Sequence, residues 1–328
     1  MWRYRGWLPI LEGEEPVSLG EGMTPLLRAA ALERELGLGR VWIKDESKNP
    51  TGSFKARGLS AAVTRATAAG VTRFTIPTAG NAGVALSAYA RRAGAAARVY
   101  APADTPPTIL KQIRAYGAEL ILLNGHIGDC GRASREYAAE SGAFDVSTLR
   151  EPYRIEGKKT LGLELAEQLG WRVPDAVIYP AGGGTGLIGI WKAFKELRRA
   201  GWIGENTTRL FAVQSSGCAP VVKAFEAGAD RTEEWKDPVT VAWGLRVPAP
   251  LGGKLMLQAL RDTGGGVVAV SDESLCSAQA ELCSELGIDA SPEGGATLAG
   301  LRELLRRGQI KRGEEVVLFN TGAGWLYR

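Results

Sequence analysis

A lysine lies in the first turn of a predicted helix in the segment Pro50-Thr51-Gly52-Ser53-Phe54-Lys55-Ala56. The proline and the glycine predict a turn, and Ser53 is a residue type that caps helices. The positive end of a helix dipole is an unusual position for a solvated cation, but it suits an amine that loses its proton and attacks an aldehyde. Lys55 is therefore either a surface lysine on a first helical turn or a nucleophile, and this segment alone favours neither.

Short β-branched runs alternate with amphipathic helical patterns on both sides of this segment. We expect strands at Val41–Lys44, Arg73–Pro77, Arg98–Ala101, Glu119–Leu123, Ala176–Pro180, Arg209–Gln214, Val267–Val270 and Val316–Asn320. We expect helices at Phe54–Ala69, Ala82–Arg92, Thr108–Tyr116, Arg132–Glu140, Thr160–Leu169, Leu187–Arg199, Asp272–Leu286 and Gly295–Arg307. This alternation predicts an α/β fold with parallel or mixed sheets covered by helices on both faces. The polar stretch Asp145–Gly157 is predicted to connect two domains, with a cleft between their sheets.

Composition excludes several classes of function. A net charge of +4 on 328 residues, with the basic residues dispersed, argues against nucleic-acid binding. The 4 cysteines show no C-x-x-C spacing and His126 is the only histidine, so we expect no metal site. We interpret His126 as a structural loop residue. No apolar run predicts a signal peptide or a membrane span, and we therefore expect a cytoplasmic protein with reduced thiols and no membrane contact.

Two further strand-to-helix turns are candidates for anion binding. In Thr78-Ala79-Gly80-Asn81-Ala82, small residues leave backbone amides open to a carboxylate, and the asparagine amide suits a phenolic oxygen. An ordinary tight turn explains this loop equally well. In Gly182-Gly183-Gly184-Thr185-Gly186, successive amides and one hydroxyl can surround a phosphate. Glycine is entropically costly, so anion binding is favoured here over a simple connector.

The glycine loop also fits a rival function. Gly184-Thr185-Gly186-Leu187-Ile188-Gly189 matches the G-x-G-x-x-G fingerprint of NAD-binding oxidoreductases. That fingerprint requires an acidic residue at the end of the next strand, where this chain has Gln214-Ser215-Ser216. The oxidoreductase is therefore the weaker hypothesis.

Thr321 follows the last predicted strand and offers a neutral hydroxyl at its carboxyl end. Such a partner leaves a pyridine nitrogen unprotonated, which suits elimination and replacement at the β or γ carbon. An aldehyde, a phenolic oxygen, a phosphate and a pyridine nitrogen are the groups of pyridoxal 5′-phosphate (PLP). We therefore predict PLP as the cofactor.

Together the four segments resemble the fold-type II PLP enzymes (the tryptophan synthase β family), most closely the threonine synthases, over nearly the whole chain. Gly22-Met23-Thr24-Pro25-Leu26 is similar to the family's G-x-T-P-L, and Pro152-Tyr153-Arg154-Ile155-Glu156-Gly157 to its P-Y-R-x-E-G. Ser291-Pro292-Glu293-Gly294-Gly295-Ala296 resembles a late segment beside the cofactor. The resemblance implies a homodimer whose active site lies in a cleft between two three-layer domains. Residues 1–57 and 157–328 would form the large PLP-binding domain, and residues 58–156 a small, mobile substrate-binding domain.

The resemblance also implies a role for each site residue. Lys55 would hold the cofactor covalently and then move the substrate's α proton, and Asn81 would hydrogen-bond the phenolic oxygen. Gly182, Gly183, Gly184, Thr185 and Gly186 would bind the phosphate, and Thr321 would meet the pyridine nitrogen. The amides of Thr78, Ala79, Gly80, Asn81 and Ala82 would bind the substrate carboxylate.

Departures from the threonine synthase pattern bear on the substrate. Ala56 replaces the usual aspartate, Ala79 and Ala82 replace threonines, and Thr148-Leu149-Arg150-Glu151 replaces N-S-V-N. Arg154 is retained, and the resemblance implies that it would bind the substrate through a phosphate or a second carboxylate. A dianionic phosphate needs several donors, so these losses weaken the case for O-phosphohomoserine. We expect a threonine synthase-like lyase acting on a small L-amino acid, with a threonine/serine ammonia-lyase as the alternative. A non-catalytic PLP-binding protein is a further alternative.

Overall fold

The computed structural model describes all residues, 1–328, and they form two compact units. Unit 1 comprises Met1–Met23, Asn49–Thr160 and Leu326–Arg328, and unit 2 comprises Thr24–Lys48 and Leu161–Trp325. The boundary falls within helix α6 (Tyr153–Gln168). None of the helices combines the length and the apolar character that a membrane span requires.

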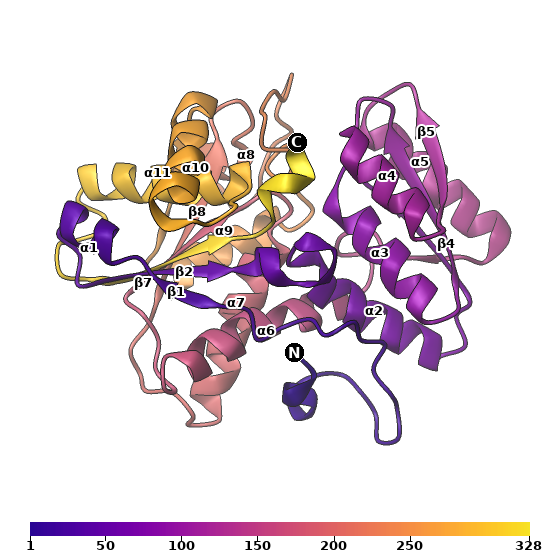
Figure 1. The fold of residues 1–328 in the computed structure, drawn as a ribbon, viewed down its shortest axis with the longest axis horizontal. Helices are drawn as coiled ribbons and strands as arrows, with labels where there is room; N and C mark the ends of the chain where they lie inside the picture. The colour runs from indigo at the N-terminus through magenta and orange to yellow at the C-terminus, as the bar shows by residue number, and fades with distance from the viewer. The chain divides into compact units, whose positions relative to one another are not determined.

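Unit 1 contains a parallel four-stranded sheet in the order β5-β4-β3-β6. Its strands are β3 (Arg73–Pro77), β4 (Ala96–Pro102), β5 (Glu119–Leu123) and β6 (Phe144–Asp145). Its helices are η1 (Trp2–Trp7), η3 (Pro50–Gly52), α2 (Lys55–Ala68), α3 (Asn81–Arg92), α4 (Pro107–Ala115) and α5 (Ile127–Ser141) (Figure 1). Helices α3 and α5 pack on the strands, and α3 also packs against α2 and η3.

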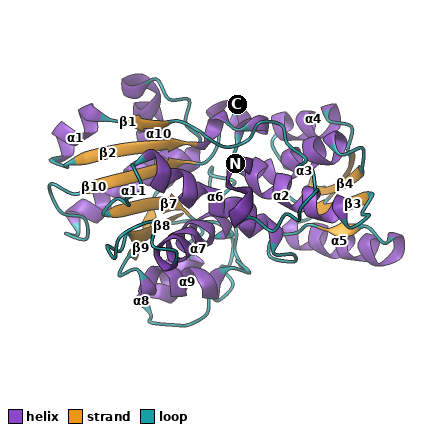
Figure 2. Ribbon diagram, turned by 90° about the horizontal axis from the view of Figure 1, so that it is seen from below, coloured by secondary structure: helices purple, strands orange, loops and turns teal.

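Unit 2 contains a mixed six-stranded sheet in the order β1-β2-β10-β7-β8-β9, which Figure 2 shows strand by strand. Only the β1–β2 pair is antiparallel. The strands are β1 (Leu26–Arg28), β2 (Arg40–Asp45), β7 (Ala176–Pro180), β8 (Arg209–Ser215), β9 (Gly266–Val270) and β10 (Glu315–Asn320). The helices are α1 (Ala30–Leu36), η2 (Glu46–Lys48), α7 (Thr185–Arg199), α8 (Pro220–Glu226), α9 (Gly253–Asp262), α10 (Asp272–Leu286), α11 (Pro292–Arg306) and η4 (Gly324–Tyr327), which ends beyond the boundary of the unit.

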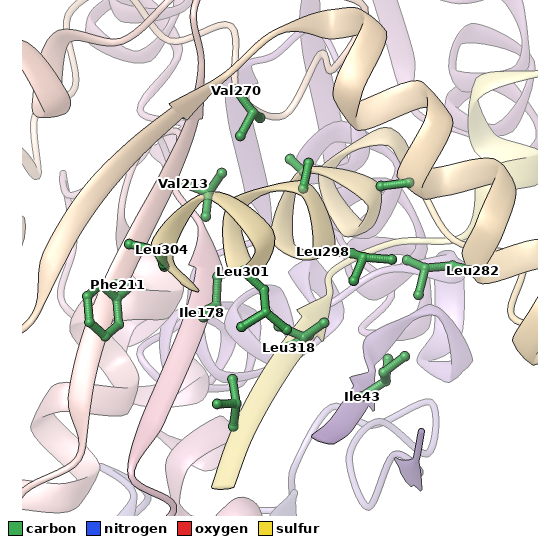
Figure 3. Close-up of a cluster of buried hydrophobic side chains, with 14 of the residues drawn as sticks. Ile43, Ile178, Phe211, Val213, Val270, Leu282, Leu298, Leu301, Leu304 and Leu318 are labelled. Carbon is green, nitrogen blue, oxygen red and sulfur yellow. The ribbon is translucent and has the colours of Figure 1, made fainter. Parts of the chain in front are cut away.

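Helix α11 supplies much of the core of unit 2. Leu298, Leu301 and Leu304 recur at helical spacing and are fully buried. In the same cluster lie Ile178 of β7 and Leu318 of β10 (Figure 3). Every residue of β7 is buried, which is the pattern of a parallel strand covered on both faces. The predicted α/β fold, with one parallel and one mixed sheet, is confirmed.

All eight expected strands and all eight expected helices form, but the segment before α6 differs from the expectation. Asp145–Gly157 is predicted to be a connection, whereas α6 already begins at Tyr153. The glycine and the charged residues of this segment hide its helical character from the hydrophobic pattern. Strands β1 and β6 and helices α1 and α8 are also absent from the prediction, because all four are short. Helix α9 is absent from it as well.

The N-terminal segment belongs to unit 1, whereas residues 1–57 are predicted to be part of the large domain. Met1 lies in a buried apolar cluster with Ala61 of α2. The carboxylate of Glu21 accepts a hydrogen bond from Ser60 Oγ at 2.7 Å. The domain boundaries expected from the sequence rest on motifs along the chain. These motifs do not indicate that the N-terminal segment packs on α2.

Candidate active site

Lys55 lies in the first turn of α2, as the sequence predicts, although the helix begins at Lys55 and not at Phe54. Its side chain is partly buried. Its Nζ lies 3.9 Å from the centre of the Phe54 ring. The cap differs from the expectation, because the N-cap residue is Phe54 and no side chain caps the helix. The hydroxyl of Ser53 is instead buried and has no hydrogen-bond partner.

Strain accompanies the unpaired hydroxyls in front of Lys55. Thr51 has a φ of +64°, in the left-handed region that L-residues other than glycine, asparagine and aspartate rarely adopt. The Oγ1 of Thr51 and the Oγ of Ser53 are both buried without a hydrogen-bond partner. Unpaired buried polar atoms are rare in folded proteins and, together with strain, are typical of ligand sites. These two hydroxyls are site candidates that the sequence analysis missed, and polar residues next to the lysine are the signal that could have found them.

Asn81 begins α3, and the N-cap Gly80 provides no side-chain cap, so the amides of this first turn receive no capping oxygen from it. Its Nδ2 lies 3.4 Å from the hydroxyl of Tyr327, and its Oδ1 is buried without a partner. Thr78 fixes the loop through its Oγ1, which accepts a hydrogen bond from Gly80 N at 3.1 Å. Tyr327 is a contact that the sequence could not reveal, since 246 residues separate it from Asn81.

Arg154 lies in the first turn of α6 and is only 2% exposed. Its Nη1 donates to the carbonyl of Val146 at 2.6 Å, while its Nε has no hydrogen-bond partner. The Glu151 carboxylate accepts from the Arg154 backbone N–H at 3.0 Å. Burial raises the pKa of Glu151 and lowers that of Arg154. Unit 1 therefore holds a buried guanidinium with a spare donor.

A second buried basic residue of unit 1, Lys158, is absent from the predicted site, unlike Arg154. It is completely buried, and its Nζ lies 5.0 Å from the centre of the Phe54 ring that Lys55 also contacts. A charged residue on a buried helix face gives no periodic signal, so the sequence pattern does not distinguish it from a solvated lysine.

In unit 2, the glycine loop and Thr321 follow two neighbouring parallel strands. Val316–Leu318 of β10 pairs with Ala176–Ile178 of β7, so both strands end at the same edge of the sheet. Thr321 is buried directly after β10. The loop Gly182–Gly186 follows β7 and opens α7. The structure thus brings the two predicted elements of unit 2 together, while Lys55, Asn81 and Arg154 lie in unit 1.

Close contacts explain the glycines of this loop. A Cβ on Gly182 would stand 2.1 Å from the carbonyl oxygen of Gly244, and one on Gly186 would stand 1.8 Å from the Tyr179 hydroxyl oxygen. Gly184 is the N-cap of α7 with a φ of +82° and no side-chain cap, and the first turn carries no acidic residue. Amides at a helix N-terminus without a capping carboxylate favour an anion.

The segment that begins at Ser291 supports the same sheet edge. Ser291 N donates to the side chain of Asn320 at 3.2 Å and to the carbonyl of Gly322 at 3.1 Å. Asn320 Nδ2 in turn donates to Asp45 Oδ1 at 2.8 Å. These bonds fix the backbone on both sides of Thr321, so its hydroxyl is presented from a rigid turn.

Both sets of residues fit PLP. In unit 2, an uncapped helix N-terminus fits the phosphate and a buried hydroxyl fits the pyridine nitrogen. In unit 1, a partly buried lysine fits the aldehyde, and Asn81 has an amide end without a partner. The oxygen and nitrogen of such an amide exchange places by a half turn, so the unpartnered end suits a phenolic oxygen. Gln214, where a dinucleotide site requires a carboxylate, is buried and donates to the Ala181 carbonyl at 2.9 Å.

Known proteins resemble this chain in sequence and fold. The family model described as "Pyridoxal-phosphate dependent enzyme" matches residues 17–322. The threonine synthase of Methanocaldococcus jannaschii is 37% identical over 99% of this chain and 80% of that protein. The threonine synthase of Methanosarcina acetivorans is 34% identical over 98% of this chain and 79% of that protein. Among solved structures, the threonine deaminase of T.th. is 28% identical, with a TM-score of 0.78 over 92% of each chain.

The family match spans both units and includes Lys55, Asn81, the glycine loop and Thr321. It confirms the predicted cofactor and enzyme class, and with them the resemblance to the tryptophan synthase β-like fold. The chain belongs to the fold-type II family of pyridoxal-phosphate dependent enzymes, and its cofactor is pyridoxal 5′-phosphate.

Proposed function

We propose that this enzyme is a lyase that converts O-phosphohomoserine and water to threonine and phosphate. The observation that carries the proposal is the buried Arg154, which lies in the same unit as Lys55. Its Nε–H has no hydrogen-bond partner. A buried guanidinium with a spare donor is costly unless an anion pairs with it, and a substrate with a distal phosphate supplies that anion. The threonine synthases that are 34–37% identical over nearly the whole chain support the same substrate.

In this proposal each residue has a defined task. The bound cofactor acts as an electron sink that lowers the cost of removing the substrate's α proton. Lys55 holds the cofactor and, once released, removes that proton with its Nζ. The amides of Thr78–Ala82 bind the substrate carboxylate, and Asn81 orients the cofactor ring. Gly182–Gly186 bind the cofactor phosphate.

We further propose the organisation of the enzyme from the family resemblance. Unit 2, which holds the glycine loop, is the larger PLP-binding domain, and unit 1 contains the mobile substrate-binding part. The enzyme acts as a homodimer in the cytoplasm, where its 4 cysteines, none of them in a disulfide, stay reduced. Light scattering after size-exclusion chromatography measures the molar mass, which should be twice that of one chain.

The substrate proposal is tested by two assays and one substitution. We expect phosphate release from O-phosphohomoserine and little 2-oxobutanoate from threonine. Arg154→Gln removes the guanidinium, so kcat/KM for O-phosphohomoserine should fall about 10²-fold, the effect of losing 2–3 kcal/mol of charged hydrogen bonds. Arg132→Gln, an exposed arginine of the same unit, is the control and should change neither assay. If Arg154→Gln and wild type have equal kcat/KM for O-phosphohomoserine, Arg154 does not bind the substrate.

A threonine/serine ammonia-lyase is the alternative function, and one observation favours it. The donors expected for a substrate phosphate are replaced by Ala79 and by the buried Glu151, which repels an anion when it is ionised. The likeness to a threonine deaminase points the same way. Formation of 2-oxobutanoate from threonine, without phosphate release from O-phosphohomoserine, would establish this alternative. Absence of both products would favour a non-catalytic PLP-binding protein.

Thr321→Asp should alter the reaction specificity. A carboxylate in place of the neutral hydroxyl favours the protonated pyridine nitrogen, which strengthens the electron sink and diverts turnover towards side reactions. The cofactor's absorbance spectrum and the ratio of products measure the effect, and Thr321→Ser, which keeps the hydroxyl, is the control. If spectra and product ratios match those of wild type, Thr321 does not contact the nitrogen.

A further inference from the structure

A small cavity in unit 2 lies outside the residues of the candidate active site. Its volume is about 280 Å³, and its walls come from the second half of α7, the segment before β8 and the end of α9. Helices α7 and α9 pack against each other and against β8. Pockets for drug-sized ligands measure about 300–1,000 Å³, so this cavity suits a single smaller molecule.

The cavity and the predicted phosphate loop lie at opposite edges of the sheet. Thr208, which lines the cavity, directly precedes β8. Strand β8 is parallel to β7, and the loop Gly182–Gly186 follows the far end of β7. Strands of this length, at about 3.3 Å per residue, separate the two edges by roughly 16–23 Å. A ligand in this cavity would therefore not touch the glycine loop.

Two buried polar atoms of residues that line this cavity have no hydrogen-bond partner. Thr208 is only 2% exposed, and its Oγ1 is the first of them. The second is Nε of Arg198, whose Nη2 donates to the carbonyl of Asn206 at 3.0 Å. A buried polar atom without a partner destabilises the fold, so these two donors indicate a ligand that accepts hydrogen bonds.

One face of α7 presents two aromatic rings and two cations to the cavity. Trp191, Phe194, Lys195 and Arg198 follow one another at helical spacing, and all four line the cavity. Phe194 is buried and Trp191 is half-buried, and together these two rings form the aromatic wall of the cavity. The Nζ of Lys195 lies 4.3 Å from the centre of the Trp191 ring, which holds the ammonium in place. This face therefore suits a ligand with an apolar group and an anionic group.

The cavity also has a negative end. Asp262 lines it and is the last residue of α9. The C-terminus of a helix carries a partial negative charge, which adds to the charge of this carboxylate. A simple anion would pair with the two cations of α7 but would be repelled by Asp262. A ligand that carries a positive and a negative charge pairs with both ends of the cavity.

We propose that this cavity is a second ligand site, which binds a free L-α-amino acid with an apolar side chain. The carboxylate of the ligand pairs with Lys195 and Arg198 and accepts a hydrogen bond from Thr208 Oγ1. Its ammonium group pairs with Asp262, and its side chain packs on the aromatic wall. The site is separate from the active site, so the proposal does not depend on which substrate the enzyme converts.

Thr240 and Arg199 provide matched controls in the same unit. Thr240 is also buried, at 7% exposure, but its Oγ1 donates to Asp272 Oδ1 at 2.7 Å. Thr240→Val therefore removes a buried hydroxyl that has a partner, whereas Thr208→Val removes one that has none. Arg199 is exposed and does not line the cavity. Arg199→Gln removes a cation from the same end of α7 without changing the cavity.

The first experiment titrates the holoenzyme with L-leucine and locates the binding by fluorine NMR. The chain is labelled with 5-fluorotryptophan, and the resonance of Trp191 among the 9 tryptophans is identified by its absence in Trp191→Phe. The absorbance of the bound cofactor, recorded on the same samples, reports on the active site. We expect a saturable shift of the Trp191 resonance that does not follow the cofactor spectrum. No shift, or a shift only in step with the cofactor spectrum, would overturn the proposal.

The second experiment removes each charged group of the ligand in turn. 3-Methylbutylamine lacks the carboxylate of leucine, and its Kd should be at least about tenfold higher, the effect of losing hydrogen bonds to a charged group. 4-Methylpentanoate lacks the ammonium group, and its Kd should be about threefold higher or more. In Asp262→Asn, leucine and 4-methylpentanoate should bind equally. If 4-methylpentanoate or inorganic phosphate binds wild type as tightly as leucine does, the cavity is a simple anion site and not an amino-acid site.

The third experiment separates ligand binding from a structural role. Thr208→Val should raise the Kd for leucine about threefold or more, while the Tm without leucine stays the same or rises, because this hydroxyl has no partner to lose. Thr240→Val should lower the Tm by about 2–4 °C and leave the Kd unchanged. Arg199→Gln should change neither. A Thr208→Val protein that binds leucine like wild type, or that loses Tm as Thr240→Val does, would reject the role of this hydroxyl and with it the proposed site.

Discussion

Lys55→Ala should abolish covalent attachment of PLP and reduce turnover by at least about 10³-fold. In the proposed mechanism the substitution removes both the nucleophile that would hold the cofactor and the base that would move the α proton, and a single positioned base alone contributes about 10²–10⁴-fold. The visible absorbance of the bound cofactor should disappear, and borohydride should fix no cofactor to the protein. Absorbance spectroscopy and the phosphate-release assay measure the two effects.

Lys48→Ala is the matched control for this experiment. Lys48 lies seven residues before Lys55, but its side chain is 60% exposed and its Nζ is 3.9 Å from an Asp45 oxygen. An exposed ion pair contributes little to stability, so this variant should bind PLP and turn over like wild type. A Lys55→Ala protein that retains the visible band and the borohydride adduct would show that another lysine carries the cofactor.

Gly182→Ala should weaken PLP binding and destabilise unit 2. The new methyl group would stand 2.1 Å from the backbone oxygen of Gly244, which cannot move aside as a flexible side chain could. Overpacking of this kind costs about 1–3 kcal/mol, and the displaced amides no longer fit the phosphate. Thermal denaturation should show a Tm lower by about 2–4 °C per kcal/mol, and titration with PLP should show a higher Kd.

Gly204→Ala is the control that distinguishes the effect of the close contact at Gly182 from the effect of replacing any glycine by alanine. No atom lies within 4 Å of a Cβ at Gly204, and its backbone is outside the left-handed region. This variant should keep the Tm and the PLP affinity of wild type within error. If Gly182→Ala binds PLP as tightly as wild type, the loop does not hold the phosphate in the proposed way.

The sequence predicts those parts of the site that depend on local structure. Lys55 lies in the first turn of a helix, and the glycine loop joins β7 to α7, because neighbouring residues determine turn chemistry and strand alternation. Helix α7 begins at Thr185, two residues before the predicted start at Leu187. The same holds for Thr321 after β10. That the glycine loop and Thr321 share a sheet edge follows from the parallel pairing of β7 and β10.

The remaining features depend on contacts between distant residues. The pairing of Asn81 with Tyr327 spans 246 positions and has no local signature. The nitrogen of Lys158 fits beside Gly58 only because two helices pack closely there. Arg154 lies in the first turn of helix α6, where the sequence predicts a polar connection. Burial of this kind is a property of the folded core, and no periodicity in the sequence marks it.

The left-handed backbone at Thr51 makes this loop a place where stability and activity compete. A glycine there would adopt the same angle without the strain of about 1 kcal/mol or more that a threonine bears. Selection for heat resistance alone would therefore favour replacing Thr51 by glycine. The replacement would also delete a buried hydroxyl four residues before Lys55, the lysine proposed to hold the cofactor. Persistence of threonine at this position under such selection would indicate that catalysis, and not folding, maintains it.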